Sequence, residues 1–169
     1  MIHAFRGISP TLHSSAFVVD SAEIIGDVVI GEGSSVWYNA VIRGDINSVR
    51  IGMRTNIQDG SLLHVRQNYP LMIGSNITVG HGAILHACRI DDNCLIGMGA
   101  IVLDNAHIKQ STLVAAGTVV RNNSEFDGGV FIAGVPGKVV RPLTVAERTM
   151  IEESAQNYVD YIHMYRQTS

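Results

Sequence analysis

Aliphatic side chains recur at every sixth residue through most of the chain, a period that an α-helix, which repeats every 3.6 residues, does not show. The pattern starts at Leu12 and is interrupted by short insertions near Asn47 and Gln67. One residue is missing before Ile90, and the pattern then continues to Val120. These repeated positions, here called anchors, are Leu12, Val18, Ile24, Ile30, Val36, Ile42, Ile51, Ile57, Leu63, Ile73, Val79, Leu85, Ile90, Ile96, Val102, Ile108, Val114 and Val120. Such a regular period predicts a repeat architecture in which each short unit forms the same element.

The pattern resembles the hexapeptide repeat of the left-handed parallel β-helix. In that fold each hexapeptide forms one face of a triangular coil, and three hexapeptides complete a turn. Taken in threes, the anchors define a first, a second and a third face, which start at Leu12, Val18 and Ile24, and they predict about six turns. We therefore expect an all-β solenoid over residues 1–125, with the anchors stacked inside and the residue after each anchor pointing out.

The end of the chain predicts a different element. We expect a connecting segment at 126–143 and an α-helix at 144–167. Thr144 and Glu147 have the spacing of a capping box, which stabilises a helix N-terminus. An apolar stripe with helical spacing follows, made of Ile151, Ala155, Tyr158, Ile162 and Tyr165. This stripe needs a partner, so the helix should pack on the solenoid or on a neighbouring subunit.

Two histidines occupy the same position in the repeat. His64 directly follows anchor Leu63, and His86 directly follows anchor Leu85, so both point out from the third face on successive turns. Vertical neighbours in such a stack lie about 4.8 Å apart, which lets two imidazoles converge on one metal ion. Arg43 heads the same column one turn earlier.

A third histidine, His81, occupies a different position in the repeat. It lies on the second face, one turn after Asp59, which has Gln58 beside it. A triangular prism cannot point its second and third faces at one place. We therefore expect a homotrimer in which the second face of one protomer meets the third face of the next. Each interface would then combine His64 and His86 of one chain with His81 of its neighbour.

Three neutral imidazoles around an open position are typical of a catalytic site for a divalent ion, most often Zn²⁺, with Fe²⁺ or Co²⁺ as alternatives. The remaining histidines are interpreted as ordinary surface residues: His3, His13, His107 and His163. Cys88 and Cys94 lie six residues apart, on successive faces, and lack the CxxC spacing of a metal site. We expect them to be buried or incidental thiols rather than metal ligands.

Composition indicates the kind of core, the class of partner and the cellular compartment to expect. Hydrophobic residues make up 46% of the chain but aromatic residues only 6%, which suits a core of stacked aliphatic side chains. The formal charge of −3 gives no reason to expect a nucleic-acid partner, and no apolar run is long enough for a membrane span. The start, "MIHAFRGISP", lacks signal-peptide features, and two cysteines suit a reducing compartment, so we expect a cytoplasmic protein.

Three stretches resemble the γ-class carbonic anhydrases and their bacterial relatives: "VIRGDINSVRIGMRTNIQDGSLLH", "VGHGAILHACRI" and "AGVPGKVVR". This resemblance implies metal binding by the three histidines and reversible hydration of carbon dioxide to bicarbonate. It also implies that Gln58 and Asp59 orient hydroxide or substrate, and that Arg43 forms an interface ion pair with Asp45 or Asp59. The further residues that it implies at the site are Asn56 and Tyr158.

The chain departs from the best-studied members of that family where they carry their proton-transfer carboxylates. They have a glutamate directly after the RGD aspartate, where this chain has Ile46, and an acidic loop where it has "VRQNYP". Slow hydration is therefore one expectation, and a non-catalytic metal-binding or scaffold homologue is an alternative. A hexapeptide acyltransferase is another alternative, because "AGVPGKVVR" resembles a segment of such enzymes. Those enzymes typically use one catalytic histidine and have no need for three.

Overall fold

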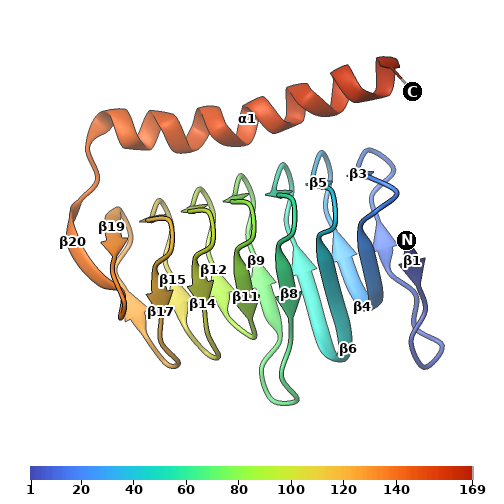
Figure 1. The fold of residues 1–169 in the computed structure, drawn as a ribbon, viewed down its shortest axis with the longest axis horizontal. Coiled ribbons are helices and arrows are strands. Elements are labelled where there is room, and N and C mark those ends of the chain that lie inside the picture. The colour runs from blue at the N-terminus through green and yellow to red at the C-terminus, as the bar shows by residue number, and fades with distance from the viewer. Residues whose placement is uncertain (169) are drawn as a thin grey trace.

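The computed structural model describes residues 1–168 and confirms the predicted fold class. The chain forms a parallel β-solenoid of about seven turns, one more than the anchors predicted, followed by a single long helix (Figure 1). The turns stack along the long axis of the molecule. Helix α1 (Val145–Thr168) runs back over the coil towards its N-terminal end (Figure 1).

The second face of the coil is one eight-stranded sheet. Its strands are parallel, except that the last strand turns back and pairs antiparallel with its neighbour. In chain order they are β3 (Phe17–Val18), β5 (Ser35–Val36), β7 (Asn56–Ile57), β10 (Thr78–Val79), β13 (Leu95–Ile96), β16 (Leu113–Val114), β19 (Val130–Ala133) and β20 (Lys138–Pro142).

The first and third faces form one twelve-stranded sheet, because two long strands bend around the corner between them. These two strands are β4 (Glu23–Ile30) and β6 (Val41–Ile51). The third face continues through β8 (Leu62–His64), β11 (Ile84–His86), β14 (Ile101–Val102) and β17 (Val119–Val120), with β1 (Ile2–His3) paired to β4. The first face comprises β2 (Thr11–Leu12), β9 (Leu71–Ile73), β12 (Arg89–Ile90), β15 (His107–Ile108) and β18 (Glu125–Phe126).

The anchors stack in register inside the coil, as the six-residue period predicted. Every anchor from Ile24 to Val120 is buried, and the two anchors before them, Leu12 and Val18, are half-buried. On the third face the ladder pairs Ile24, Ile42, Leu63, Leu85, Val102 and Val120 in succession. Full burial of such a side chain contributes about 1.5–3 kcal/mol relative to exposure, so the aliphatic columns are the main source of stability.

The coil extends beyond residue 125, the end that the pattern of anchors predicts. Phe126 pairs with Ile108 on the first face, and Ile132 pairs with Val114 on the second. The six-residue period therefore persists through segment 126–133, although glycines lie between Phe126 and Ile132 and directly after Ala133. Strand β20 then covers the open edge of β19, which removes a row of unpaired backbone groups.

Two corners of the second face place polar side chains for the site. Asp59 and His81 are each followed by a glycine with φ of +67°, Gly60 and Gly82. This left-handed backbone conformation costs glycine little and most other residues more. The turn lets the chain leave the second face sharply, so Asp59 and His81 lie at its corner rather than within a strand.

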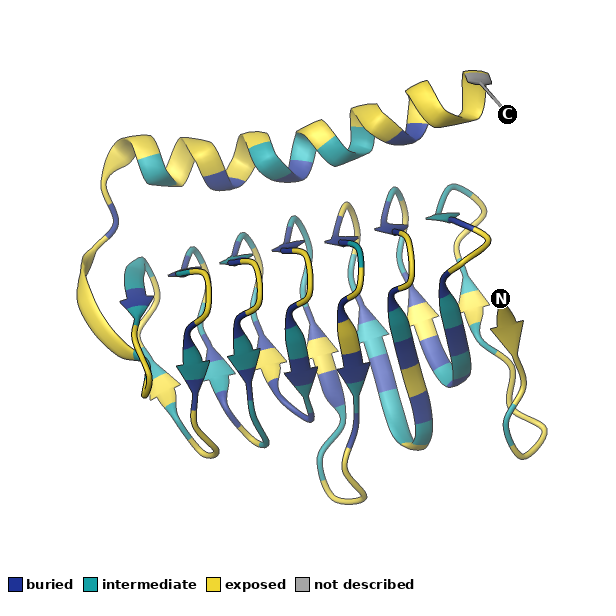
Figure 2. Cartoon of the chain, viewed as in Figure 1, coloured by how far each residue is buried: buried dark blue, intermediate teal, exposed yellow. Residues whose placement is uncertain are grey.

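The helix begins as predicted and packs on the second face of its own chain. The Glu147 backbone N–H donates to Thr144 Oγ1 (3.2 Å), and the Thr144 N–H donates to a Glu147 carboxylate oxygen (2.9 Å). Ile151, Ala155 and Ile162 are buried, and the buried positions of α1 lie on the side that faces the coil (Figure 2). No helix among the described residues has the length and apolar character needed to cross a membrane.

Candidate metal centre

Arg43, His64 and His86 form one outward column on the third face. The strand register pairs Arg43 with His64 and His64 with His86, which is the arrangement that the repeat predicted. Asp45 lies beside this column: it forms an ion pair with Arg43, and its Oδ1 lies 3.0 Å from His64 Nε2. The carboxylate of Asp45 therefore contacts two members of the column, Arg43 and His64.

The two imidazoles face each other through nitrogens that have no carboxylate partner. His64 Nδ1 lies 3.2 Å from His86 Nε2, while the other nitrogens contact Asp45 and Asp104. A neutral imidazole has a single N–H group. In each ring this N–H donates to the neighbouring carboxylate, so the nitrogen that faces the other ring carries a lone pair. Two lone pairs this close repel each other unless a cation lies between them. Two nitrogens of one tetrahedral zinc ion, at bond lengths of about 2.0–2.1 Å, lie roughly 3.3 Å apart, close to the observed separation.

The electrostatics of His64 favour the neutral ring that a metal ligand must present. Burial lowers its pKa most, and the nearby Arg43 and His86 lower it further. The hydrogen bond to Asp45 opposes these effects without cancelling them, so the pKa of His64 lies below its ordinary value. At neutral pH the ring is therefore unprotonated and able to donate a lone pair.

Asp104 and Arg66 also belong to this cluster, and the six-residue pattern predicts neither of them. Asp104 contacts His86 Nδ1 through one oxygen and Arg66 through the other, at 2.7 Å. Asp104 lies two residues after anchor Val102, on the turn that follows His86. It does not directly follow an anchor, so the pattern does not single it out. Its place near the end of a third-face unit, one turn after His86, was the sequence feature that could have identified it.

A second polar group surrounds His81 on the second face. His81 Nδ1 lies 2.8 Å from Asp59, and its backbone N–H donates to Gln58 Oε1 at 3.2 Å. Gln58 in turn donates to Asn56 Oδ1 at 3.1 Å, and Asn56 donates to Thr78 Oγ1 at 3.0 Å. Gln58 and Asn56 are buried, so this chain of amides holds their orientation, whereas the His81 side chain is 44% exposed.

Tyr158 reaches the same region from the helix. It lines, with Asp59, a pocket of about 320 Å³, and its ring packs edge-on against Trp37 at a centroid distance of 5.4 Å. Burial and the negative charge of Asp59 raise the pKa of Tyr158 to about 12. The phenol therefore remains protonated at physiological pH.

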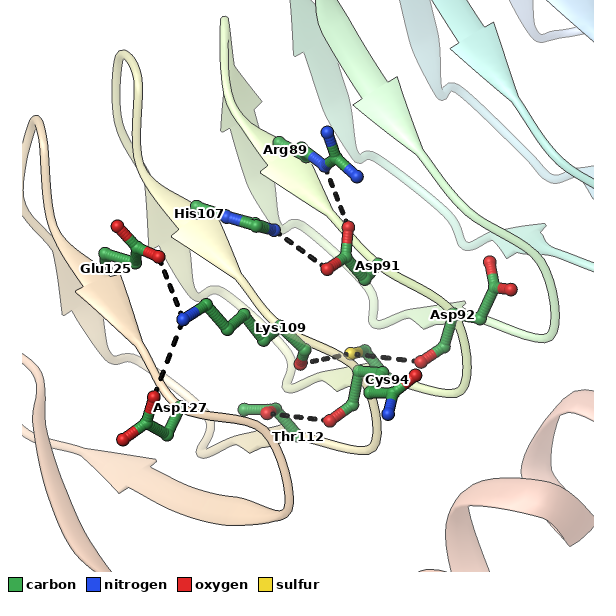
Figure 3. A network of polar contacts seen from close by, with 10 residues as sticks. Arg89, Asp91, Asp92, Cys94, His107, Lys109, Thr112, Glu125 and Asp127 are labelled. Carbon is green, nitrogen blue, oxygen red and sulfur yellow. Dashed lines mark hydrogen bonds and ion pairs between the residues drawn. The ribbon is translucent and has the colours of Figure 1, made fainter.

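The structure keeps the two groups on different faces of one chain. Within residues 1–168 of a single chain, no set of three or more His, Cys, Asp or Glu side chains is arranged to hold a metal ion. His107 pairs with Asp91 on the first face (Figure 3), whereas the histidine column lies on the third face. Cys88 and Cys94 are free and buried, and burial raises the pKa of each to about 12.

The position that lacks a proton-transfer carboxylate is open to solvent. The Ile46 side chain is 51% exposed, next to Asp45, whose oxygens already contact Arg43 and His64. The loop after His64 adds a cation, Arg66, and no carboxylate.

Comparisons with known proteins identify the relatives of this chain. A scan of protein-family profiles finds none that matches. The chain is 42% identical over 163 residues to γ carbonic anhydrase 2 of Arabidopsis thaliana mitochondria; the match covers 93% of this chain but 59% of the relative, so the chain spans about three fifths of that protein. It is 43% identical over 166 residues to a carbonic anhydrase of Geobacillus kaustophilus, covering 98% of this chain and 91% of the relative.

Solved structures agree with these sequence matches. A Bacillus cereus protein, provisionally named an acetyltransferase, superimposes with a TM-score of 0.97 and 40% identity over 99% of this chain and 98% of its own. A Vibrio cholerae hexapeptide-repeat acetyltransferase, at 20% identity and a TM-score of 0.59, shares the fold alone. The fold, the histidine column and the coverage of the relatives together show that this chain belongs to the γ-class carbonic anhydrase-like family of left-handed β-helix proteins.

Proposed function

We propose that this chain is the subunit of a homotrimeric, metal-dependent carbonic anhydrase that reversibly hydrates carbon dioxide to bicarbonate. The observation that carries the proposal is the pair of facing nitrogens of His64 and His86, each left with a lone pair because an aspartate holds the opposite side of its ring. The names of the Arabidopsis and Geobacillus relatives support the same activity.

The metal site would combine His64 and His86 of one protomer with His81 of the next. Each of these histidines has its own aspartate, and for His81 this is Asp59 at Nδ1, which leaves Nε2 to act as the donor. Three nitrogen donors favour Zn²⁺, and the same set also accepts Fe²⁺ or Co²⁺. When bound, the ion would supply the Lewis-acid chemistry that makes hydroxide available near neutral pH.

The residues of the chain would orient the reaction. The buried amides of Asn56 and Gln58 hold each other in place beside His81. We assign to Gln58 and Asp59 the orientation of hydroxide and carbon dioxide, which the family resemblance implies. Tyr158, protonated at the wall of the adjacent pocket, would offer a hydrogen-bond donor there.

The trimer itself would complete the site. Arg43 and Asp45 lie beside the histidine column, where the neighbouring second face would dock. The Arg43 side chain is 44% exposed in the isolated chain and would become covered on assembly. The buried thiols suit a reducing compartment, and we place the trimer in the cytoplasm.

Proton removal would limit the rate. Each hydration releases a proton, and rapid turnover needs a base that relays it to solvent. Ile46 cannot accept a proton, and the loop after His64 contributes Arg66 instead of a carboxylate. The same observation supports a second candidate, a metal-binding homologue with no significant turnover.

Stopped-flow carbon dioxide hydration and metal analysis on one anaerobically prepared, metal-defined sample would test the proposal. The expected result is hydration that depends on bound metal and is abolished in both His64→Ala and His86→Ala. Bound metal without hydration at any buffer concentration would favour the non-catalytic candidate, and a chain that binds no metal would refute both.

A further inference from the structure

We propose that Asp104 is a positioning residue for His86, and that the two insertions in the hexapeptide pattern form the brace that holds Asp104. The inference rests on the proposed function, because the bound metal defines the orientation that His86 must keep. It concerns residues that neither the repeat nor the family resemblance singled out.

The carboxylate of Asp104 is held at both oxygens. Oδ1 contacts His86 Nδ1, and Oδ2 accepts a hydrogen bond from the Arg66 guanidinium at 2.7 Å. The Asp104 side chain is only 15% exposed, whereas that of Arg66 is 58% exposed. A carboxylate with a partner on each oxygen has little freedom to rotate, so the ring that it contacts is held as well.

The insertions explain why Arg66 stands where it does. The Asn47 side-chain amide, from the first insertion, donates to the backbone carbonyl of Arg66 at 3.1 Å and to that of Gln67 at 3.0 Å. Arg66 and Tyr69 exchange two backbone hydrogen bonds of 3.0 Å, which close the second insertion into a tight loop. The two breaks in the repeat therefore meet and present a cation to Asp104.

This brace has a chemical consequence for His86. Because Asp104 accepts a hydrogen bond from the Nδ1–H of His86, the lone pair of the ring stays on Nε2, the atom that faces His64. Without the carboxylate the ring can rotate or move its proton to Nε2, and each change removes a metal donor. Loss of a carboxylate that orients a metal-bound histidine typically weakens metal binding about 10–100-fold.

The first face offers a matched control within the same chain. There, Asp91 contacts His107 Nε2 and Arg89 Nε, each at 2.8 Å (Figure 3). This triad has the same composition as Arg66, Asp104 and His86. Its Asp91 side chain is 27% exposed, and no second histidine faces His107 among the contacts of the described residues. Asp91→Ala therefore removes equivalent contacts without touching the candidate metal centre.

The test is the affinity of the intact protein for Zn²⁺, measured by competition with a chelator. We expect Asp104→Ala to weaken binding about 10–100-fold, Arg66→Gln to weaken it several-fold, and Asp91→Ala to leave it unchanged. Asp104→Asn keeps the volume but removes the charge and one acceptor, and it should fall between the wild type and Asp104→Ala. It also serves as the test variant if Asp104→Ala does not fold.

A second measurement uses metal-free protein and separates this inference from the proposed function. Nitrogen-15 NMR of His86 should show the proton on Nδ1 in the wild type and a changed tautomer population in the Asp104 variants. Equal Zn²⁺ affinities for the Asp104 and Asp91 variants, or an unchanged His86 tautomer, would overturn the inference and leave the proposed function standing. A wild-type chain that binds no Zn²⁺ would overturn the proposed function and, with it, the metal-orienting role of Asp104.

Discussion

His64 Nδ1 lies 3.2 Å from His86 Nε2, and the opposite nitrogen of each ring contacts an aspartate. The strand register produces this pair, because β8 and β11 align the two residues on successive turns. His81, which we propose as the third ligand, lies outside this column, at a corner of the second face beside Asp59. The metal site that we propose would therefore be completed only by assembly of the trimer.

The first prediction concerns metal content. His81→Ala should lose bound Zn²⁺ as completely as His64→Ala, although the two residues lie on different faces, because a three-ligand site loses most of its affinity with any one imidazole. Metal analysis of the purified trimers checks this, with the exposed His163, on α1, as the control position. A His81→Ala protein with full metal occupancy would show that His81 is not a ligand.

The second prediction concerns assembly. Arg43→Ala should weaken the trimer, because Asp45 would be left without its cation once the interface covers it. Removing one partner of a buried ion pair costs about 3–5 kcal/mol, so trimer dissociation should become measurable by sedimentation at micromolar concentration. Arg89→Ala, on the first face, is the control, since it also pairs with an aspartate. Identical dissociation of the two variants would place Arg43 outside the interface.

The third prediction concerns rate. Hydration should be slow in weak buffer and should rise with the concentration of an imidazole-type buffer, because no carboxylate stands at the exposed position of Ile46 to relay protons. Ile46→Glu should raise the rate in weak buffer and reduce its dependence on buffer. Ile46→Gln, which has a similar size and no titratable group, is the control. Fast hydration by the wild type in weak buffer would reveal a relay elsewhere.

The fourth prediction concerns acid stability. Burial acts to raise the pKa of Asp91, but the hydrogen bonds from Arg89 and His107 outweigh it, so this pKa lies below its ordinary value of 3.8. Such a group stabilises the fold fully above the pKa of the unfolded chain, and this stability is lost as the pH falls through the folded pKa. Urea unfolding at pH 7 and at pH 3 should therefore show Asp91→Asn less stable than the wild type at pH 7, with a smaller loss on acidification.

The exposed Asp20 provides the comparison for that experiment. Asp20→Asn should follow the wild-type dependence on pH. If Asp91→Asn and Asp20→Asn behave alike, the first-face contacts of Asp91 contribute no stability.

The residues that the sequence could place are those that follow the six-residue period. His64 and His86 follow anchors directly, and the strand ladder pairs them as the period required. The period could not place Asp104 and Arg66, because their meeting depends on how two insertions fold against each other. Regular repeats determine register, whereas the shape of an inserted loop depends on local hydrogen bonds that have no period.

The end of the coil is a second feature that the sequence pattern did not predict correctly. Phe126 keeps the six-residue spacing from Val120, and so does Ile132 one unit later. Gly128 and Gly129 lie between these two inward residues, and the ladder continues across them. The six-residue spacing, extended past Val120, is the signal that marks this last turn.

Subunit mixing tests the shared site most directly. His64→Ala and His81→Ala chains, carrying different tags, are co-expressed, and the mixed trimers are isolated and analysed for Zn²⁺ and hydration. Each pure variant lacks every complete site, but a mixed trimer has one junction at which intact His64 and His86 meet an intact His81 of the neighbour. The account predicts about one Zn²⁺ per mixed trimer, with partial recovery of hydration; mixed trimers without metal would contradict it, because a site confined to one chain is broken in both variants.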